Sequence, residues 1–181
     1  MPVILDEKGL KRTLVRLSHE IEEKNEGLDG VVLIGVKRGG EIVAERLKSE
    51  LKSGTGVSVP AAGLDIGMTR DDLVSAFFVP DAGVNELGFD ITGKRVVLCD
   101  DVLHTGRSAV AGIEALFRLG RPERIELLVL VDRGGRELPV RADFVGKNVP
   151  TSRSEYVSVH FRELGAECDE LAIVGRNHAE E

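Results

Sequence analysis

The sequence contains no tryptophan, one tyrosine and two cysteines among its 181 residues. Cys99 and Cys168 are too few and too far apart for a disulfide framework or a metal-binding pair, so we expect both as reduced thiols. No apolar run approaches the roughly 18 residues of a membrane span, and the first residues lack the basic and apolar regions of a signal peptide. We therefore expect a cytoplasmic protein with no membrane partner.

An overall excess of positive charge is also missing, because 24 Lys and Arg stand against 31 Asp and Glu, for a net charge of −7. This balance excludes a protein that holds nucleic acid over its whole surface. The charge is uneven, however: residues 163–181 hold six acidic residues, whereas residues 8–19 carry basic residues and no acid. The sequence is therefore still compatible with a basic face on one part of the surface. The length and the ordinary globular composition predict a single domain over 1–181.

The pattern of apolar residues predicts an α/β fold with a mostly parallel central sheet flanked by helices. Helices begin where amphipathic spacing begins, and strands are short apolar runs rich in β-branched residues. The expected helices are 6–26, 41–51 and 107–119, and the expected strands are 31–36, 57–59, 63–67, 95–99 and 125–131.

Two of these helices have core faces that the spacing defines. The first helix would bury Leu10, Leu14, Leu17 and Ile21, with Asp6 as its N-cap. The helix over 107–119 would bury Val110, Ile113, Leu116 and Phe117.

A long stretch over 69–94 has weak periodicity. A connection of this length inside a compact domain is usually a lid or a binding loop. A β-hairpin with Asp81, Ala82 and Gly83 near its tip is equally compatible with the pattern, and the two readings do not exclude each other.

Three polar clusters follow the predicted strands, at 37–40, 100–108 and 132–136. In parallel sheets, ligands bind beyond the carboxyl ends of the strands, so we expect the three clusters to form one site. The sharpest cluster is Asp100-Asp101 followed by Thr105-Gly106-Arg107-Ser108. Two carboxylates near a diol, and a short turn at a helix N-terminus that favours an anion, describe a ribose 5-phosphate site. In a competing interpretation, these residues only cap turns and the helix.

The stretch 96–108 resembles the phosphoribosyl-diphosphate signature of type I phosphoribosyltransferases, with four apolar residues, two acids and a Thr-Gly turn. More narrowly, the chain resembles the bifunctional pyrimidine-operon regulator/uracil phosphoribosyltransferase family. The resemblance runs from about residue 3 to 160 and rests on four further blocks: Val3-Ile4-Leu5-Asp6, Thr69-Arg70-Asp71-Asp72-Leu73, the run from Val131 to Pro139, and the run from Gly146 to Ser152.

This resemblance implies a type I phosphoribosyltransferase fold with a flexible lid, and the transfer of phosphoribose from phosphoribosyl diphosphate to uracil, giving UMP. It assigns Asp100, Asp101 and Arg70 to catalysis, with Arg70 on the lid. Mg²⁺ would bind near the two carboxylates, mostly through substrate oxygens. The implied substrate-binding residues are Lys37, Arg38, Gly39 and Gly40 for diphosphate, Val102, Leu103, His104, Thr105, Gly106, Arg107 and Ser108 around the 5-phosphate, and Asp132 and Arg133 for uracil.

The chain departs from the family at a few positions. Thr-Arg-Gly is frequent where this chain has Arg38-Gly39-Gly40, and Tyr is frequent where His104 stands. His104 suggests a general base, but its place in the turn favours a positional role, because the sequence shows no partner that would tune its pKa.

The family's regulatory role implies binding of pyrimidine-operon mRNA, rather than DNA, by a homodimer or higher homo-oligomer that responds to UMP or UTP. Basic side chains are what a phosphate backbone requires. The candidate RNA-binding residues form two groups: Arg12, Arg16 and His19 on the first helix, and Arg136, Arg141, Lys147 and Arg153 farther along the chain. From the residues alone, a solvated charged face is the favoured interpretation, and the RNA-binding role comes from the resemblance.

Two alternative functions remain. In the first, the protein is a transferase of the same fold that uses another base, such as orotate or a purine. In the second, it is a catalytically weak RNA-binding regulator that keeps the site as a nucleotide sensor.

Overall fold

The computed structural model describes residues 2–66 and 87–175. Arg70 and most of the expected lid over 69–94 lie outside the described residues. The elements are β1 (Val3–Leu5), α1 (Glu7–Lys24), β2 (Val31–Val36), α2 (Gly39–Thr55), β3 (Ala61–Leu64), β4 (Arg95–Leu103), α3 (Arg107–Leu119), β5 (Arg124–Asp132), β6 (Phe144–Asn148), β7 (Glu155–His160), the short 3-10 helix η1 (Arg162–Leu164) and β8 (Glu170–Gly175).

The central sheet has the strand order β3-β2-β4-β5-β6, and all of its neighbouring strands are parallel. The register aligns Leu103 of β4 with Asp132 of β5, and Asp132 with Asn148 of β6. The carboxyl ends of three adjacent strands therefore meet in one row. The parallel α/β architecture predicted from the sequence is confirmed.

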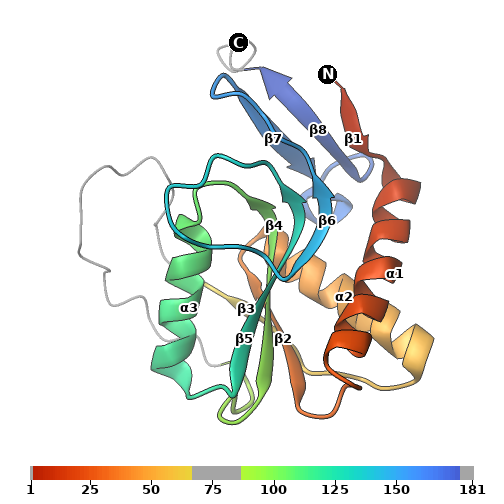
Figure 1. The fold of residues 1–181 in the computed structure, drawn as a ribbon. Coiled ribbons are helices and arrows are strands. Elements are labelled where there is room, and N and C mark those ends of the chain that lie inside the picture. Colours follow the sequence, from red (N-terminus) through yellow and green to blue (C-terminus); the bar gives the residue numbers. More distant parts are fainter. Residues whose placement is uncertain (1, 67–86, 176–181) are drawn as a thin grey trace.

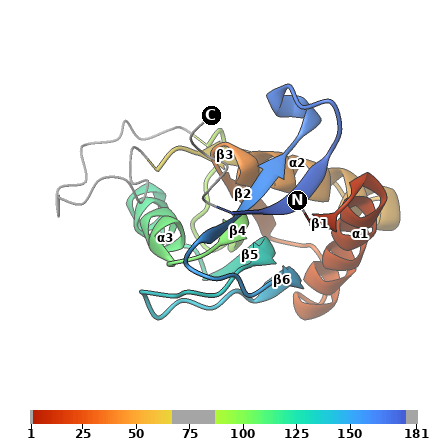
Figure 2. The same cartoon turned by 90° about the horizontal axis from the view of Figure 1, so that it is seen from above.

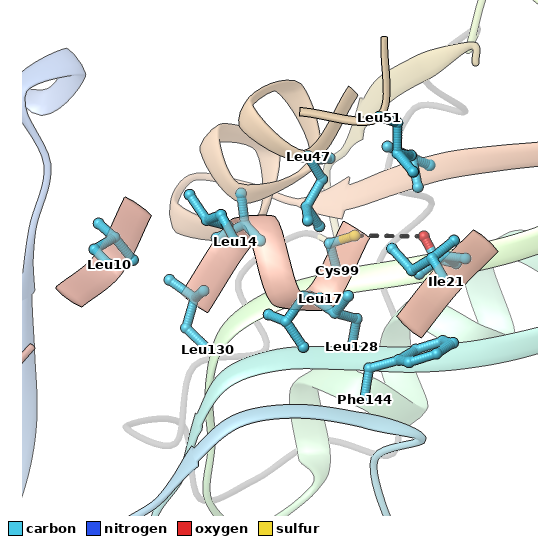
Figure 3. Close-up of a cluster of buried hydrophobic side chains, with 14 of the residues drawn as sticks. Leu10, Leu14, Leu17, Ile21, Leu47, Leu51, Cys99, Leu128, Leu130 and Phe144 are labelled. Atoms are coloured by element: carbon cyan, nitrogen blue, oxygen red, sulfur yellow. Dashed lines mark hydrogen bonds between the residues drawn. The ribbon is translucent and has the colours of Figure 1, made fainter. Parts of the chain in front are cut away.

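Helices cover both faces of the sheet (Figures 1 and 2). On one face, α1 and α2 contribute to a buried apolar cluster that also includes Cys99, Leu128 and Phe144, drawn in Figure 3. The predicted core positions of α1 are all buried there, and Asp6 caps this helix by accepting a hydrogen bond from the Gly9 N–H at 2.7 Å. The second apolar cluster lies on the other face, beneath α3.

Phe117 departs from the expected core face of α3. Its side chain is 61% exposed, whereas the neighbouring Leu116 is fully buried. Ala109 and Gly112, which are small, complete the buried side of the helix. Gly112 lies against the Leu98 side chain, so small residues allow α3 to approach the sheet closely and leave the Phe117 ring on the outer surface.

The boundaries of three elements also differ from the sequence-based expectation. The expected strands are 57–59 and 63–67, and within the described part of this range, up to residue 66, only Ala61–Leu64 forms a strand. Helix α2 begins at Gly39, before the expected position 41, and continues to Thr55 rather than 51. Strand β4 extends to Leu103 instead of ending at Cys99, because its pairing with β5 continues through the acidic residues.

A second, smaller sheet stands at the end of the molecule where β4 and β5 finish (Figure 1). It is antiparallel and has the order β1-β8-β7. Its inward-facing side chains Val157, Val159 and Ile173 pack against the cluster beneath α1 and α2. Its strands come from the two ends of the described chain, and the sequence analysis did not predict them. No helix among the described residues is long and apolar enough to cross a membrane.

Candidate active site

Three loops meet at the carboxyl edge of the central sheet, as the parallel topology requires. They are residues 37–40 after β2, residues 100–108 at the end of β4, and residues 132–136 at the end of β5. The Arg133 N–H donates to the Leu103 carbonyl at 3.0 Å, which joins the second and third loops. The first loop is joined to the second by the close packing of two glycines.

Gly39 and Gly40 lie directly against the end of β4. A Cβ at Gly39 would collide with the Asp101 carboxylate, and a Cβ at Gly40 would collide with the Cys99 carbonyl oxygen. Glycine is the residue that permits such close backbone approach. The peptide between Lys37 and Arg38 is cis, and both of these cationic side chains are exposed beside the two glycines.

Asp100 and Asp101 lie within the last part of β4. Asp100 Oδ1 accepts a hydrogen bond from the Asp101 N–H at 2.9 Å, and Asp101 Oδ1 accepts one from the Val102 N–H at 2.7 Å. Burial raises the pKa of the Asp100 carboxyl well above its ordinary value, and the neighbouring Asp101 charge raises it further. Two adjacent carboxylates with this electrostatic strain favour a cationic partner.

The acidic pair fits a partial Mg²⁺ site. Carboxylate oxygens are suitable ligands for Mg²⁺, which keeps several waters and shares its coordination with substrate phosphates. Among the described residues, no group of three or more His, Cys, Asp or Glu side chains gathers to hold a metal ion. Two carboxylates on β4 would leave positions on the ion for waters and for oxygens of a bound ligand.

The turn over 104–107 leads from β4 into the N-terminus of α3. Gly106 is the N-cap residue with φ of +95°, a conformation that favours glycine. Gly106 has no side chain that could cap the helix, and the free N–H groups at a helix N-terminus favour an anion. The buried Thr105 accepts a hydrogen bond from the Arg107 N–H at its Oγ1, at 3.3 Å. Ser108 is half-buried in the first turn.

The loop after β5 is held in shape by its own charges. Asp132 accepts hydrogen bonds from the Gly134 N–H at 2.9 Å and from the Arg136 guanidinium. Burial opposes ionisation of Asp132, but these hydrogen bonds outweigh it and lower the pKa of the carboxyl. Next to it, the buried Arg133 donates to the Glu155 carbonyl at 2.6 Å, which connects the loop to β7.

His104 lies between this loop and the turn before α3. A Cβ at Gly135 would be 2.9 Å from His104 Nε2, so the imidazole packs against glycine backbone. Val102 is half-buried and Leu103 is buried at the same end of β4. The structure therefore brings together every expected substrate-binding residue that it describes.

Arg136 has a different environment from the exposed residues with which the sequence grouped it. It is partly buried, and it donates to the His104 carbonyl at 2.7 Å and the Val140 carbonyl at 3.1 Å as well as to Asp132. This side chain braces the loop after β5 against the turn after β4.

The other expected RNA-binding residues lie on the surface. Arg12, Arg16 and His19 are exposed on α1, and Arg141, Lys147 and Arg153 are exposed before, in and after β6. Arg16 lies beside β6, because it donates to the carbonyl of Gly146, the residue before Lys147, at 2.6 Å. It also forms an ion pair with Glu20 on its own helix. Lys147 in turn donates to the Ile4 carbonyl at 3.0 Å. An open hollow of about 440 Å³ is lined by Lys8, Lys11, Arg12 and Val15.

Two hydrogen-bonded contacts at the site could not be predicted from the sequence pattern. Glu137 accepts from Arg107 at 2.8 Å, which links the end of the loop after β5 to the first residue of α3. The Glu155 carbonyl accepts a hydrogen bond from the Arg133 guanidinium, although the two residues are 22 positions apart in sequence. A strand pattern around 155–160 is the only signal that would have placed Glu155 near the site.

Comparisons with known proteins agree with this arrangement. The family model described as phosphoribosyl transferase domain matches residues 4–161. A protein of Geobacter sp. (strain M21), named bifunctional protein PyrR, is 53% identical over 159 residues, which cover 88% of this chain and 90% of the relative. The protein of the same name from Clostridium perfringens is 49% identical over 161 residues, covering 89% and 90%.

Solved structures share the fold at lower sequence identity. The hypoxanthine phosphoribosyltransferase of Trypanosoma cruzi superimposes with a TM-score of 0.71 at 18% identity and covers 97% of both chains. A hypoxanthine phosphoribosyltransferase from Staphylococcus aureus gives a TM-score of 0.74 at 19% identity, covering 99% of this chain and 94% of that one. At this identity the likeness concerns the fold and does not identify the base.

Proposed function

The chain belongs to the phosphoribosyl transferase family and, within it, to the bifunctional PyrR proteins, and on that premise we propose that it transfers phosphoribose to uracil and also binds pyrimidine-operon mRNA. The observation that carries the catalytic half is the packing of Gly39 against the Asp101 carboxylate. It brings the loop expected to hold diphosphate next to the carboxylates expected to face the ribose. A substrate with both groups would contact the two loops at once.

The charges of the site suit a reaction in which positive charge develops on the ribose. The bond from the ribose to diphosphate breaks, and diphosphate leaves with the electron pair. A bond to the uracil nitrogen forms, and the proton of that nitrogen passes to solvent. Asp100 and Asp101 stabilise the developing charge, whereas Lys37 and Arg38 stabilise the departing diphosphate. The raised pKa of Asp100 means that positive charge beside the pair draws Asp100 toward its ionised form.

The remaining residues hold the substrates. The N–H groups at the start of α3, with the Thr105 and Ser108 hydroxyls, would bind the 5-phosphate. The loop with Asp132 and Arg133 would hold uracil, and Arg136 keeps that loop in shape. Bound Mg²⁺ would neutralise charge on the diphosphate, and Asp100 and Asp101 are the residues beside which it would lie.

RNA binding is supported by the basic face that α1 and β6 form. We define this basic face as the exposed residues Arg12, Arg16, His19, Arg141, Lys147 and Arg153. The contact between Arg16 and the Gly146 carbonyl connects α1 to the strand that carries Lys147. Aromatic stacking has little part in it, since the sequence has one tyrosine and no tryptophan. Recognition would rest on phosphate contacts and on the shape of the RNA. Both activities belong in the cytoplasm, where free uracil and transcripts meet.

The test is a panel of bases with phosphoribosyl diphosphate and Mg²⁺, followed by filter binding of pyrimidine-operon leader RNA with and without UMP. The proposal predicts UMP formation from uracil and RNA affinity that changes with UMP. Turnover of orotate or a purine instead would replace the substrate. RNA binding without any turnover would make the site a sensor.

A further inference from the structure

Arg46, in the second turn of α2, joins this helix to the segment between β7 and β8. Its guanidinium donates to Glu163 through Nε at 2.9 Å and through one terminal nitrogen at 2.6 Å. It also donates to the two carboxylate oxygens of Asp169 at 2.7 and 2.9 Å. The same group lies 5.0 Å from the centre of the Phe161 ring. We call Arg46, Glu163 and Asp169 the α2 clamp.

The α2 clamp stays charged at neutral pH. Burial lowers the pKa of the Arg46 guanidinium, but the hydrogen bonds to Glu163 and Asp169 outweigh that effect and raise it. Hydrogen bonds from Arg46 lower the pKa of both carboxyls. Bidentate pairing with two carboxylates needs the planar fork of arginine, and lysine cannot reproduce it. The arrangement therefore fixes orientation as well as proximity.

The position of the α2 clamp matters because, among the described residues, two arginines connect β7 and the segment after it to elements of the expected site. These contacts add to the apolar packing of the small sheet and to the contact from Lys147 to β1. At one end, Arg133 from the loop after β5 holds the Glu155 carbonyl at the start of β7. At the other end, the α2 clamp holds the connection that follows β7. Helix α2 begins at Gly39, in the expected diphosphate loop. The second attachment therefore connects the small sheet to the helix that follows this loop.

We propose that Arg46 is a positioning residue for the transferase reaction, which holds the small sheet so that Arg133 and its loop are in place for the base. This inference rests on the proposed function for its kinetic consequence only. The diphosphate side does not depend on the clamp, because Gly39 and Gly40 pack directly on β4. Val43, Leu47 and Leu51 independently anchor α2 in the core.

The loop expected to bind the base depends on the α2 clamp, whereas the diphosphate loop does not. This difference allows kinetics to distinguish a positioning role of Arg46 from a general effect on stability. Loss of the α2 clamp would release the base side and leave the diphosphate side in place. We expect Arg46→Met to raise the KM for uracil about tenfold, with the KM for phosphoribosyl diphosphate changing less than about twofold. Arg46→Lys, which reaches fewer carboxylate oxygens, would give an intermediate KM for uracil. A purely structural role would reduce the fraction of folded protein and leave both KM values unchanged.

Glu163→Gln serves as the milder variant if Arg46→Met does not fold, because it removes one charge of the α2 clamp and keeps its shape. Arg162→Met is the matched control. Arg162 lies in the same connection, and among the described residues the ion pair of its guanidinium is with the exposed Glu7 at 3.1 Å. Its charge lowers the pKa of Asp169 less than the charge of Arg46 does. We expect the control to have wild-type KM values for both substrates.

Amide hydrogen exchange of the whole protein tests the α2 clamp without relying on turnover. Arg46→Met should accelerate exchange in β7 and β8 relative to the wild type, with little change in β4 and β5. Equal changes in the two sheets, or no change, would overturn the positioning role. Faster exchange with unchanged KM for uracil would overturn it as well. If the wild type does not turn over uracil, the proposed substrate is wrong, and the exchange pattern still decides whether Arg46 orients the small sheet.

Discussion

The Asp101 carboxylate occupies the space in which a side chain on Gly39 would lie. Residue 39 is the first of α2, and residue 101 lies on the neighbouring strand β4. This relationship explains why a glycine is needed after Lys37-Arg38, and why two loops 60 residues apart in sequence behave as one site. It also gives the most direct structural test of the diphosphate loop.

Gly39→Ala should raise the KM for phosphoribosyl diphosphate at least about tenfold, because the new methyl group displaces either the loop or the Asp101 carboxylate. Steady-state kinetics at fixed uracil measures the effect. Gly54→Ala is the control in the same helix, since its Cβ would meet only His19 Cε1 at 4.0 Å. Alanine there should leave both KM values unchanged and raise stability by about 0.5 kcal/mol. Wild-type kinetics for Gly39→Ala would contradict the account of the loop.

Asp100→Asn should abolish turnover and raise the free energy of unfolding at pH 7 by about 1 kcal/mol or more. The pKa of Asp100 is raised in the folded protein, so the folded state holds this proton more tightly than the unfolded state. Its contribution to stability therefore falls as the pH rises from the ordinary value of about 4 through the raised pKa. Asparagine does not ionise, so the gain should shrink as the pH falls toward 4. Urea denaturation at both pH values measures the difference, and a less stable variant at pH 7 would refute the explanation.

Much of the fold was predictable from the sequence because local patterns and tertiary packing agree. The buried strands β2, β4 and β5 are continuous apolar runs, and α1 has the helical spacing of its core residues. Strand β7 has no buried residue and β6 has one, so neither shows the continuous apolar run of a buried strand. Strand β8 does contain an apolar run, Leu171–Val174, but the run is only four residues long and lies in the acidic C-terminal segment. Phe117 is a different case, because the helical spacing predicts a buried side chain and the structure shows an exposed one. Spacing alone does not tell which apolar residues a helix buries when a glycine brings the helix close to the sheet.

The pair Leu116 and Phe117 gives a stability test on adjacent residues. Leu116→Ala should cost about 2–5 kcal/mol of unfolding free energy, because its side chain is fully buried and a cavity would remain. Phe117→Gln should change it by less than about 0.5 kcal/mol, as expected at an exposed position. Chemical denaturation of the two variants decides the matter. A larger loss from Phe117→Gln would show that the ring is covered in the protein.

Arg136→Met should lower the free energy of unfolding by about 1–2 kcal/mol at pH 7, a value between those of exposed and buried ion pairs. The pKa of Asp132 is lowered in the folded state, with Arg136 as a cause. The stabilisation is therefore complete above the ordinary value of about 4 and is lost as the pH falls through the lowered pKa. The difference between variant and wild type should accordingly be smaller at pH 2.5 than at pH 7. A difference that grows toward low pH would contradict this account.

Arg12→Ala combined with Arg141→Ala should weaken RNA binding and leave uracil turnover unchanged. Both side chains are exposed on the basic face, whereas Arg16 also holds the edge of β6 through the Gly146 carbonyl. Removing two phosphate contacts should reduce the slope of log affinity against log salt by about 1.5. Filter binding over a range of salt concentrations measures that slope, with Lys52→Ala at the end of α2 as the control. An unchanged slope would exclude this face as the RNA site.

The site was more predictable in its residues than in its contacts. The motif residues from Asp100 to Ser108 are contiguous, so the sequence could name them and the parallel sheet could bring the other loops to them. The interactions of Arg136 and Arg46 depend on which distant carbonyl or carboxylate lies nearby. Arg136 was therefore assigned to the surface with its exposed neighbours, and Arg46 had no signal, because a single arginine on a helix is usually solvated.

The most direct test of the central claim is kcat/KM for uracil and for hypoxanthine, measured on one preparation with phosphoribosyl diphosphate and Mg²⁺, with Asp100→Asn/Asp101→Asn as the inactive control. Hypoxanthine is included in this comparison because the solved structures that share the fold are named hypoxanthine phosphoribosyltransferases. We predict UMP formation from uracil, no turnover of hypoxanthine, and no activity in the folded control. Turnover of hypoxanthine with none of uracil, or full activity in the control, would contradict the account.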